Sequence, residues 1–318
     1  MKRIKILLCP VVGMILVLLP SLIHAQPYFW RVASLFMLAL LIAAGLHLVT
    51  GMARVISLCH VAFCGVGAYV AGRLTLSCGM PPLVSVAVGA VVAGIAALIL
   101  GWVTLSLEDL YLTLATLAAS EILGNVFRGC TALTGGANGL IGVPPLSILR
   151  MSFASPDRYF LVCAVAAVGA LALILRLEDS ILGKSLRAVG DSEILVESFG
   201  LRRDVLRLVA FGVGGALAGL AGAIAAHVDG FVGPESFGVA QSVSYLCFLV
   251  IGGLGRFRSI IIAGVFAILA TEFLRGFQGW QMVILSALAI FILWWSSRTG
   301  PSSPKVRVLR KAAPARLT

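Results

Sequence analysis

The chain consists of apolar segments about as long as a lipid bilayer is thick, separated by short polar intervals. A helix needs roughly 20 residues to cross the hydrocarbon core, and about 17 is the lower limit. Ten segments approach or exceed that length: 6–23, 32–49, 55–73, 82–103, 111–127, 159–175, 206–228, 239–253, 260–274 and 281–296. Because lipid offers no hydrogen bonds to a backbone, such segments cross as helices. We predict an all-α, polytopic transmembrane bundle of about ten segments, of which the last three are short enough to be broken or re-entrant.

Composition argues against the soluble classes. Only 12% of residues are charged and 60% are hydrophobic, whereas a soluble domain has about 25% charged residues. The net charge of +11 would suit a nucleic-acid-binding protein. The basic residues lie in the polar intervals between apolar runs, however, so we expect no nucleic-acid partner. The 7 cysteines form no CxxC pair, and we interpret them as small buried residues.

The distribution of basic residues predicts the orientation. If all ten segments cross and both termini are cytosolic, three-quarters of the 24 Lys and Arg residues face the cytosol, as the positive-inside rule requires. The first 26 residues resemble a signal peptide, but we interpret them as an uncleaved first span. We expect one transmembrane domain, residues 1–296, and a basic, disordered cytosolic tail, residues 297–318, that lies against anionic membrane lipid.

The longest polar interval, residues 176–207, lies between two of these segments. Two short helices fit it, 180–189 and 192–199, each followed by a glycine where a helix stop belongs. Ser180 and Asp191 are in position to cap them. The orientation above places this interval in the cytosol, where it would offer a shaped knob to a soluble partner. A solvated loop without a partner is the alternative.

Small residues four positions apart in the sequence predict close helix packing. Gly215 and Gly219 form a GxxxG step, Ala218 with Gly222 extends the small face, and Ala68 with Gly72 repeats the spacing in another segment. Such residues let helix backbones approach where lipid provides no hydrophobic drive. This pattern fits a compact bundle and a subunit interface equally well.

The sequence contains no GxxxxGK[ST] phosphate loop. The glycine-rich stretch 135–139 lacks the following Lys and Ser or Thr, and we interpret it as a tight turn with left-handed backbone positions. If ATP drives this protein, ATP and Mg²⁺ must therefore bind to other chains, and we expect no cofactor on this one. No Ser/His/Asp constellation or metal-ligand spacing is present, so we predict a protein that is not an enzyme.

Three of the polar residues inside apolar segments are candidates for a role in transport. His60 must find a partner within the bundle, and Glu121 with Asn125 lies one helical turn apart on one face. An intramembrane carboxylate usually faces a bundle interior or a wet cavity. These residues are our candidates for lining a translocation path or for bracing the bundle, with bracing favoured.

Several motifs, in order, resemble those of branched-chain amino acid ABC-transporter permeases of the LivM type. The first reads SLCHVAFCGVGAY (57–69) and resembles the family's SLGHAAFFGIGAY, with Cys59 in place of Gly and Cys64 in place of an aromatic residue. The remaining motifs are YLTLATLA with EIL (111–123), LTGGANGL with Gly142 and Pro144, GKSLRAV onward (183–200), AGLAGA (218–223), PESF (234–237) and GGLG (252–255). The resemblance covers residues 31–296.

The resemblance implies residue roles at two places. The family's cytosolic loop is a coupling helix that docks on an ATPase, and the matching residues here are Gly183, Lys184, Leu186, Arg187, Asp191, Glu193, Glu197 and Gly200. The periplasmic loop signature corresponds to Thr134, Gly135, Gly136, Asn138 and Gly139.

The resemblance also implies partners and a function. The partners are a second, LivH-like permease, two ATP-binding subunits resembling LivG and LivF, and a periplasmic substrate-binding protein, all at a bacterial inner membrane. The expected function is import of leucine, isoleucine and valine, or of related small polar solutes. A urea or short-amide permease is the alternative within the family. A secondary transporter coupled to an ion gradient is the alternative from another class, and it would need several intramembrane carboxylates.

Overall fold

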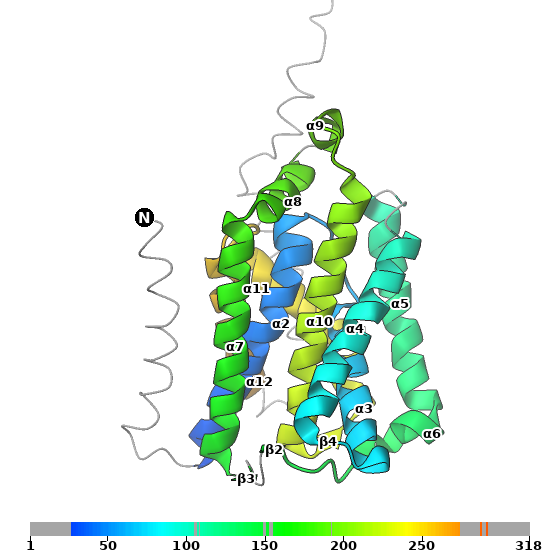
Figure 1. Ribbon diagram of the computed structural model, residues 1–318, viewed down its shortest axis with the longest axis vertical. Helices are drawn as coiled ribbons and strands as arrows, with labels where there is room; N and C mark the ends of the chain where they lie inside the picture. The colour runs from blue at the N-terminus through cyan, green and yellow to red at the C-terminus, as the bar shows by residue number, and fades with distance from the viewer. Residues whose placement is uncertain are drawn as a thin grey trace, which may run out of the picture.

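The computed structural model describes residues 27–104, 107, 109–148, 151–152, 155–191, 193–273, 287 and 291, which form a helical bundle (Figure 1). The longer helices, labelled as in Figure 1, are α2 (Pro27–Leu46), α3 (His60–Cys78), α4 (Pro82–Thr104), α5 (Asp109–Gly129), α7 (Pro156–Asp179), α10 (Arg203–Asp229), α11 (Val239–Gly252) and α12 (Arg258–Phe273). The shorter ones are η1 (His47–Met52), α6 (Thr131–Thr134), η2 (Gly136–Asn138), α8 (Ile181–Asp191), α9 (Glu193–Ser198) and η3 (Pro234–Phe237). The expected first span 6–23 and the tail 297–318 lie outside the described residues, as does segment 281–296 except for positions 287 and 291.

Within the described residues, six helices are long and apolar enough to cross a membrane: α2 continued by η1, α3, α4, α5, α7 and α10. The predicted all-α membrane bundle is therefore confirmed. Helices α11 and α12 have only 14 and 16 residues, as their short apolar segments indicated. The count of ten spans and the cytosolic location of the termini stay predictions.

The two ends of the bundle differ. Helices α8 and α9 project from one end, and α6 with the short strands lies at the other (Figure 1). These strands are β1 (Leu140–Ile141), which pairs with β4 (Phe231–Val232), and β2 (Ser147–Ile148), which pairs with β3 (Met151–Ser152). An ion pair, Arg31 with Asp229 at 3.3 Å, joins the start of α2 to the end of α10. We call the two ends the α8 end and the Arg31 end.

Local sequence signals set several helix boundaries. Pro82 and Pro156 are the first residues of α4 and α7, where proline costs no hydrogen bond because the first N–H groups have no intrahelical partner. Gly79 and Gly230 follow α3 and α10 in the left-handed conformation, the usual way to end a helix. The residue types at these positions therefore determine where these helices begin and end.

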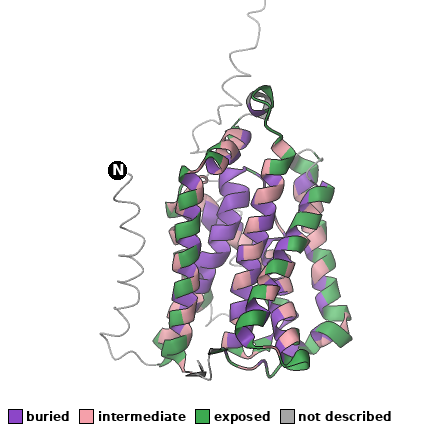
Figure 2. Ribbon diagram, in the orientation of Figure 1, coloured by how far each residue is buried: buried purple, intermediate pink, exposed green. Residues whose placement is uncertain are grey.

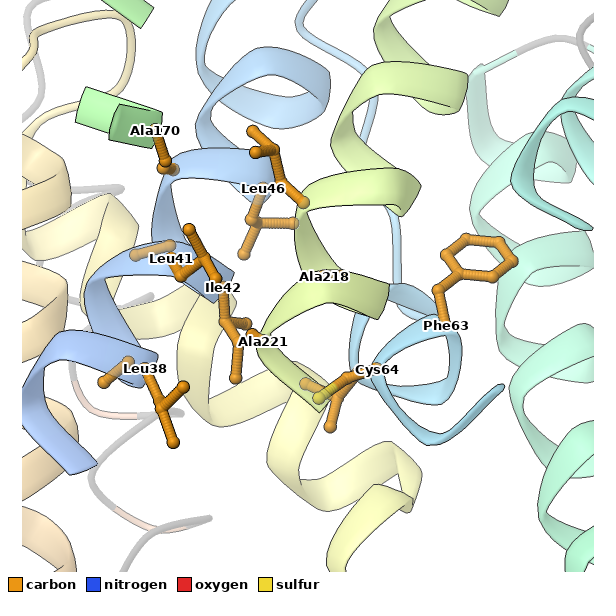
Figure 3. Close-up of a cluster of buried hydrophobic side chains, with 14 of the residues drawn as sticks. Leu38, Leu41, Ile42, Leu46, Phe63, Cys64, Ala170, Ala218 and Ala221 are labelled. Carbon is orange, nitrogen blue, oxygen red and sulfur yellow. The ribbon is translucent and has the colours of Figure 1, made fainter. Parts of the chain in front are cut away.

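The core lies along α2 and α10, which Figure 2 shows as largely buried, whereas α4, α5 and α7 expose much of their surface. Figure 3 shows part of the contact: Leu38, Leu41, Ile42 and Leu46 of α2 lie near Ala218 and Ala221 of α10, beside Cys64 of α3. Leucine side chains thus pack against alanines, which keeps the two central helices close. The exposed faces of α4 and α7 are mainly apolar, as contact with lipid requires.

The small residues predicted to bring helices together do so within this chain. A Cβ atom added to Gly219 of α10 would lie 2.2 Å from Ala93 Cβ of α4, and one added to Gly215 would lie 2.3 Å from Ala97 Cβ. A Cβ on Gly222 would lie 1.9 Å from the carbonyl oxygen of Cys64 in α3. The GxxxG face therefore packs α10 against α4 and α3 and forms no free subunit interface.

One predicted segment begins in the wrong place. The apolar run was expected to be helical from Val55, but α3 begins at His60. Residues 53–59 run as a largely buried connection from η1 to α3, from which Arg54 and Ile56 are exposed, and Arg54 has a φ of 57°. Side-chain hydroxyls replace the missing helical hydrogen bonds: Leu58 N–H donates to Thr116 Oγ1 at 3.1 Å, and Val61 N–H donates to Ser242 Oγ at 3.2 Å. The hydropathy of this run could not reveal the break, because the connection is mainly apolar and largely buried as well.

Candidate functional site

Helices α8 and α9 form the predicted knob between α7 and α10. Ser180 caps α8, because its Oγ accepts the Gly183 N–H at 3.1 Å, as predicted. Leu186 and Val189 are buried against the bundle, and Gly183 lets α8 fold back tightly, since an added Cβ would lie 1.9 Å from Leu177 O. The inner face of α8 is thus fixed by packing, and Lys184 on its outer face is exposed.

The boundary between the two helices differs from the prediction. Gly190 does not stop α8, which continues to Asp191. The glycine is required by close packing instead: an added Cβ would lie 2.4 Å from Arg54 Cγ and 2.8 Å from Met52 O. Asp191 was expected to cap the second helix, but its carboxylate lies 3.6 Å from the Arg54 guanidinium. The predicted stop at Gly200 is confirmed, with a φ of 74°.

The knob exposes large apolar side chains that the sequence pattern did not indicate as a contact surface. Ile181 at the start of α8 is 84% exposed and Phe199 after α9 is 75% exposed. Figure 1 shows α8 and α9 at one end of the bundle, with α9 projecting beyond the long helices. Exposed apolar anchors in a polar setting are typical of protein interfaces.

Beneath the knob lies a buried polar cluster that the sequence did not indicate. Glu178, near the end of α7, has a side chain only 8% exposed. Its Oε1 lies 2.7 Å from an Arg187 guanidinium nitrogen on α8 and 3.2 Å from Nε2 of His47, the first residue of η1. The other ring nitrogen of His47 lies 3.2 Å from Ser259 Oγ on α12. We call Glu178, His47, Arg187 and Ser259 the Glu178 cluster.

The three candidates for a translocation path, His60, Glu121 and Asn125, lie on two different helices. His60 is buried at the start of α3, and its ring lies against α2, where a Cβ added to Gly45 would fall 2.8 Å from His60 Nε2. Glu121 and Asn125 are both exposed on α5, and Asn125 Oδ1 accepts a hydrogen bond from Arg128 at 3.0 Å. The structure thus separates His60 from the other two, and all three roles stay predictions.

The glycine-rich loop lies at the Arg31 end and forms the predicted tight turn. Gly135, Gly136 and Gly139 have φ values of 76°, 68° and 70°. Thr134 Oγ1 donates to a backbone carbonyl and accepts the Gly136 N–H at 3.2 Å. A Cβ on Gly139 would lie 2.3 Å from Val232 O, because the loop leads directly into the β1–β4 pair. These residues fix the loop's shape and its place beside α10.

A cavity of about 730 Å³ lies between α2, α3, α10, α11 and α12. Its walls are mainly apolar, with Ile42, Val61 and Phe248 among them. The Arg31–Asp229 pair also borders it. Apolar walls with a few polar groups are typical of small-molecule sites, which measure roughly 300–1,000 Å³. The cavity can therefore accommodate a small solute with an aliphatic side chain.

Comparison with known proteins agrees with this arrangement. A family model described as the permease component of branched-chain amino acid transport systems matches residues 28–293. The chain is 29% identical over 287 residues to the high-affinity branched-chain amino acid transport system permease protein LivM of Escherichia coli K12, covering 83% of this chain and 68% of the relative. It is also 26% identical over 191 residues to the autoinducer 2 import system permease protein LsrC of E. coli, covering 57% of this chain and 51% of that protein.

No solved structure matches the chain closely enough to add a further comparison. The family match spans most of the described bundle, from α2 through α12, and includes the knob and the glycine-rich loop. The chain belongs to the family of permease components of branched-chain amino acid transport systems.

Proposed function

We propose that this chain is the transmembrane permease subunit of an ATP-binding-cassette importer that carries leucine, isoleucine and valine from periplasm to cytoplasm across a bacterial inner membrane. The observation that carries the proposal is the family match over residues 28–293. The mainly apolar cavity beside α2 and α10 supports an aliphatic substrate.

The proposal assigns the energy source to other chains. The sequence has no phosphate loop, so two ATP-binding subunits would hold ATP and Mg²⁺, and this chain would catalyse no reaction. A second homologous permease would complete the transmembrane part, and a periplasmic binding protein would deliver the substrate. The capped helix α8 and the exposed Ile181 and Phe199 give the ATP-binding subunits a rigid surface to contact.

The mechanism follows from these positions. ATP binding draws the two ATP-binding subunits together, and α8 moves with the subunit on which it is docked. Because α8 packs on η1 and on the end of α7, this movement changes the packing of the bundle. The bundle opens outward to the loaded binding protein and opens inward after hydrolysis.

The direct test of this role replaces Arg187 and Glu193 with alanine. Arg187→Ala removes the guanidinium that contacts Glu178 at 2.7 Å, and Glu193 begins α9. We expect leucine uptake to fall at least tenfold in each variant. The measurements are uptake in membrane vesicles and recovery of the ATP-binding subunits with the tagged permease. Normal values for both would remove the coupling role from α8 and α9.

The exposed face of α5 is our candidate for the translocation path. Glu121 lies near the middle of this membrane-capable helix and is exposed, and a carboxylate facing lipid would cost several kcal/mol. Water or a second permease therefore covers this face. We expect Glu121→Leu to lower uptake about tenfold, the effect of about 1.4 kcal/mol, and Glu121→Gln to lower it less.

Complex assembly and the ATPase rate are the controls for this prediction. If Glu121→Leu raised the amount of complex and left uptake unchanged, the α5 face would contact lipid and the path would lie elsewhere.

Other substrates and energy sources have distinct signatures. Competition by urea or short amides against leucine uptake would support the alternative within the family. Uptake that an uncoupler abolishes and ATP depletion does not would support an ion-coupled carrier. The family match argues against that second alternative, because the matched family is defined as a permease component of a larger system.

A further inference from the structure

The Glu178 cluster joins four separate elements through one carboxylate. Glu178 belongs to α7, Arg187 to α8, His47 to η1 and Ser259 to α12. Two of the contacts meet at the same oxygen, Oε1, at 2.7 Å from Arg187 and 3.2 Å from His47. The His47 and Ser259 side chains are fully buried. Arg187 alone extends to the surface, with a side chain 40% exposed.

The proton positions within the cluster follow from the chemistry of its members. A carboxylate only accepts hydrogen bonds, so the His47 Nε2–H donates to Glu178 Oε1, and the Arg187 guanidinium donates to the same oxygen. This fixes the imidazole ring, whose Nδ1 then meets the Ser259 hydroxyl at 3.2 Å. The ring therefore bridges α7 to α12 and cannot rotate without losing both contacts.

The surrounding backbone leaves little room for independent movement. A Cβ on Gly51 would lie 2.6 Å from His47 Nδ1, and one on Gly252 would lie 2.4 Å from Ser259 Cα. The His47–Met52 segment is a π-helix, a rare geometry that often marks functional sites within helices. This segment continues α2, the most buried of the membrane-capable helices.

A buried cluster of this kind is weak evidence of a role in stability. Burying a charged pair costs desolvation energy that the attraction between its members only partly offsets, and apolar replacements of similar volume are often neutral or stabilising. Discrete, packed hydrogen-bonded groups can, however, link the positions of the elements that they join. Arg187 lies on the helix that the proposed function docks on an ATP-binding subunit, whereas His47 and Ser259 lie in the bundle.

We propose that Glu178 is the positioning residue that transmits displacement of α8 to η1 and α12, so that ATP hydrolysis drives transport. Through this carboxylate, a shift of Arg187 pulls the His47 ring and changes the packing of α2 against α12. This inference rests on the proposed function, because it takes α8 as the contact with the ATP-binding subunit. It adds a residue to which the resemblance assigns no role, and a route into the core.

The experiment uses the complete importer in proteoliposomes with its loaded binding protein. Glu178→Gln keeps the shape of the side chain and removes the charge that holds Arg187 and His47. We expect normal assembly with the ATP-binding subunits and normal basal ATPase activity, together with at least a tenfold fall in leucine imported per ATP hydrolysed. A purely structural role would lower the amount of complex and leave this ratio unchanged.

The matched control is Asp179→Asn, which removes the neighbouring carboxylate from the same helix end. Asp179 is exposed, and we expect its ratio of import to hydrolysis to stay normal. A normal ratio in Glu178→Gln would overturn the inference, and an equal fall in both variants would do so as well.

If the Glu178→Gln permease does not assemble with the ATP-binding subunits, the Ser259→Ala variant provides the test. This change removes only the hydroxyl at the far end of the cluster, and we expect a several-fold fall in the same ratio. A normal ratio in Ser259→Ala would overturn the inference. Failure of the proposed function itself would look different, because the wild-type chain would then import leucine without the ATP-binding subunits.

Discussion

Phe199→Asp is expected to release the ATP-binding subunit from the permease. The phenyl ring is 75% exposed beyond the end of α9, and Figure 1 shows no other described element covering this helix. An apolar anchor at the centre of an interface contributes about 2 kcal/mol or more, so a carboxylate there should weaken binding by at least about 30-fold. The measurement is recovery of the ATP-binding subunits with affinity-tagged permease, together with leucine uptake.

Ile141→Asp is the matched control for Phe199→Asp. Ile141 is similarly exposed, at 73%, but it lies in β1 at the Arg31 end. We expect it to retain the ATP-binding subunits. If Phe199→Asp also retained them at wild-type levels, the apolar surface of the knob would have no part in docking.

Gly219→Val is expected to prevent accumulation of folded protein. The first added carbon would already lie 2.2 Å from Ala93 Cβ and 3.3 Å from Gly89 O in α4. Neither atom belongs to a flexible side chain, so α10 and α4 must separate. Overpacking typically costs about 1–3 kcal/mol, and separating α10 from α4 should reach the upper part of that range. The measurement is the amount of monodisperse permease extracted from membranes.

Gly169→Val is the control for this change. Gly169 lies in α7, and an added Cβ there would meet nothing within 4 Å. We expect its yield to match that of the wild type. Equal yields for Gly169→Val and Gly219→Val would show that α10 does not need its small face to pack against α4.

Features that depend on neighbouring residues could be predicted from the sequence. Ser180 caps α8 through an N–H three residues away, and Gly200 ends the second helix with a left-handed conformation. The long apolar runs predicted the bounds of the central membrane-capable helices to within a few residues. They could do so because contact with lipid and burial in the bundle both require apolar side chains. The close packing of α10 followed from its small residues, although the pattern left its partner open.

Features that depend on distant residues could not be predicted. Glu178 and His47 are 131 positions apart, and nothing in either local sequence indicates the other. Gly190 has the residue type of a helix stop, but contact with Met52 and Arg54 determines its role. Similarly, the spacing of Glu121 and Asn125 placed them on one face, whereas only the packing of α5 shows that this face is exposed.

The most direct measurement of the account as a whole is leucine uptake by proteoliposomes that hold the purified permeases, with and without the ATP-binding subunits. With the subunits, the loaded binding protein outside and ATP accessible to the subunits, we expect accumulation that stops when a non-hydrolysable ATP analogue replaces ATP. Without them, we expect only leakage. Steady accumulation driven by an ion gradient, in the absence of any ATP-binding subunit, would contradict the account.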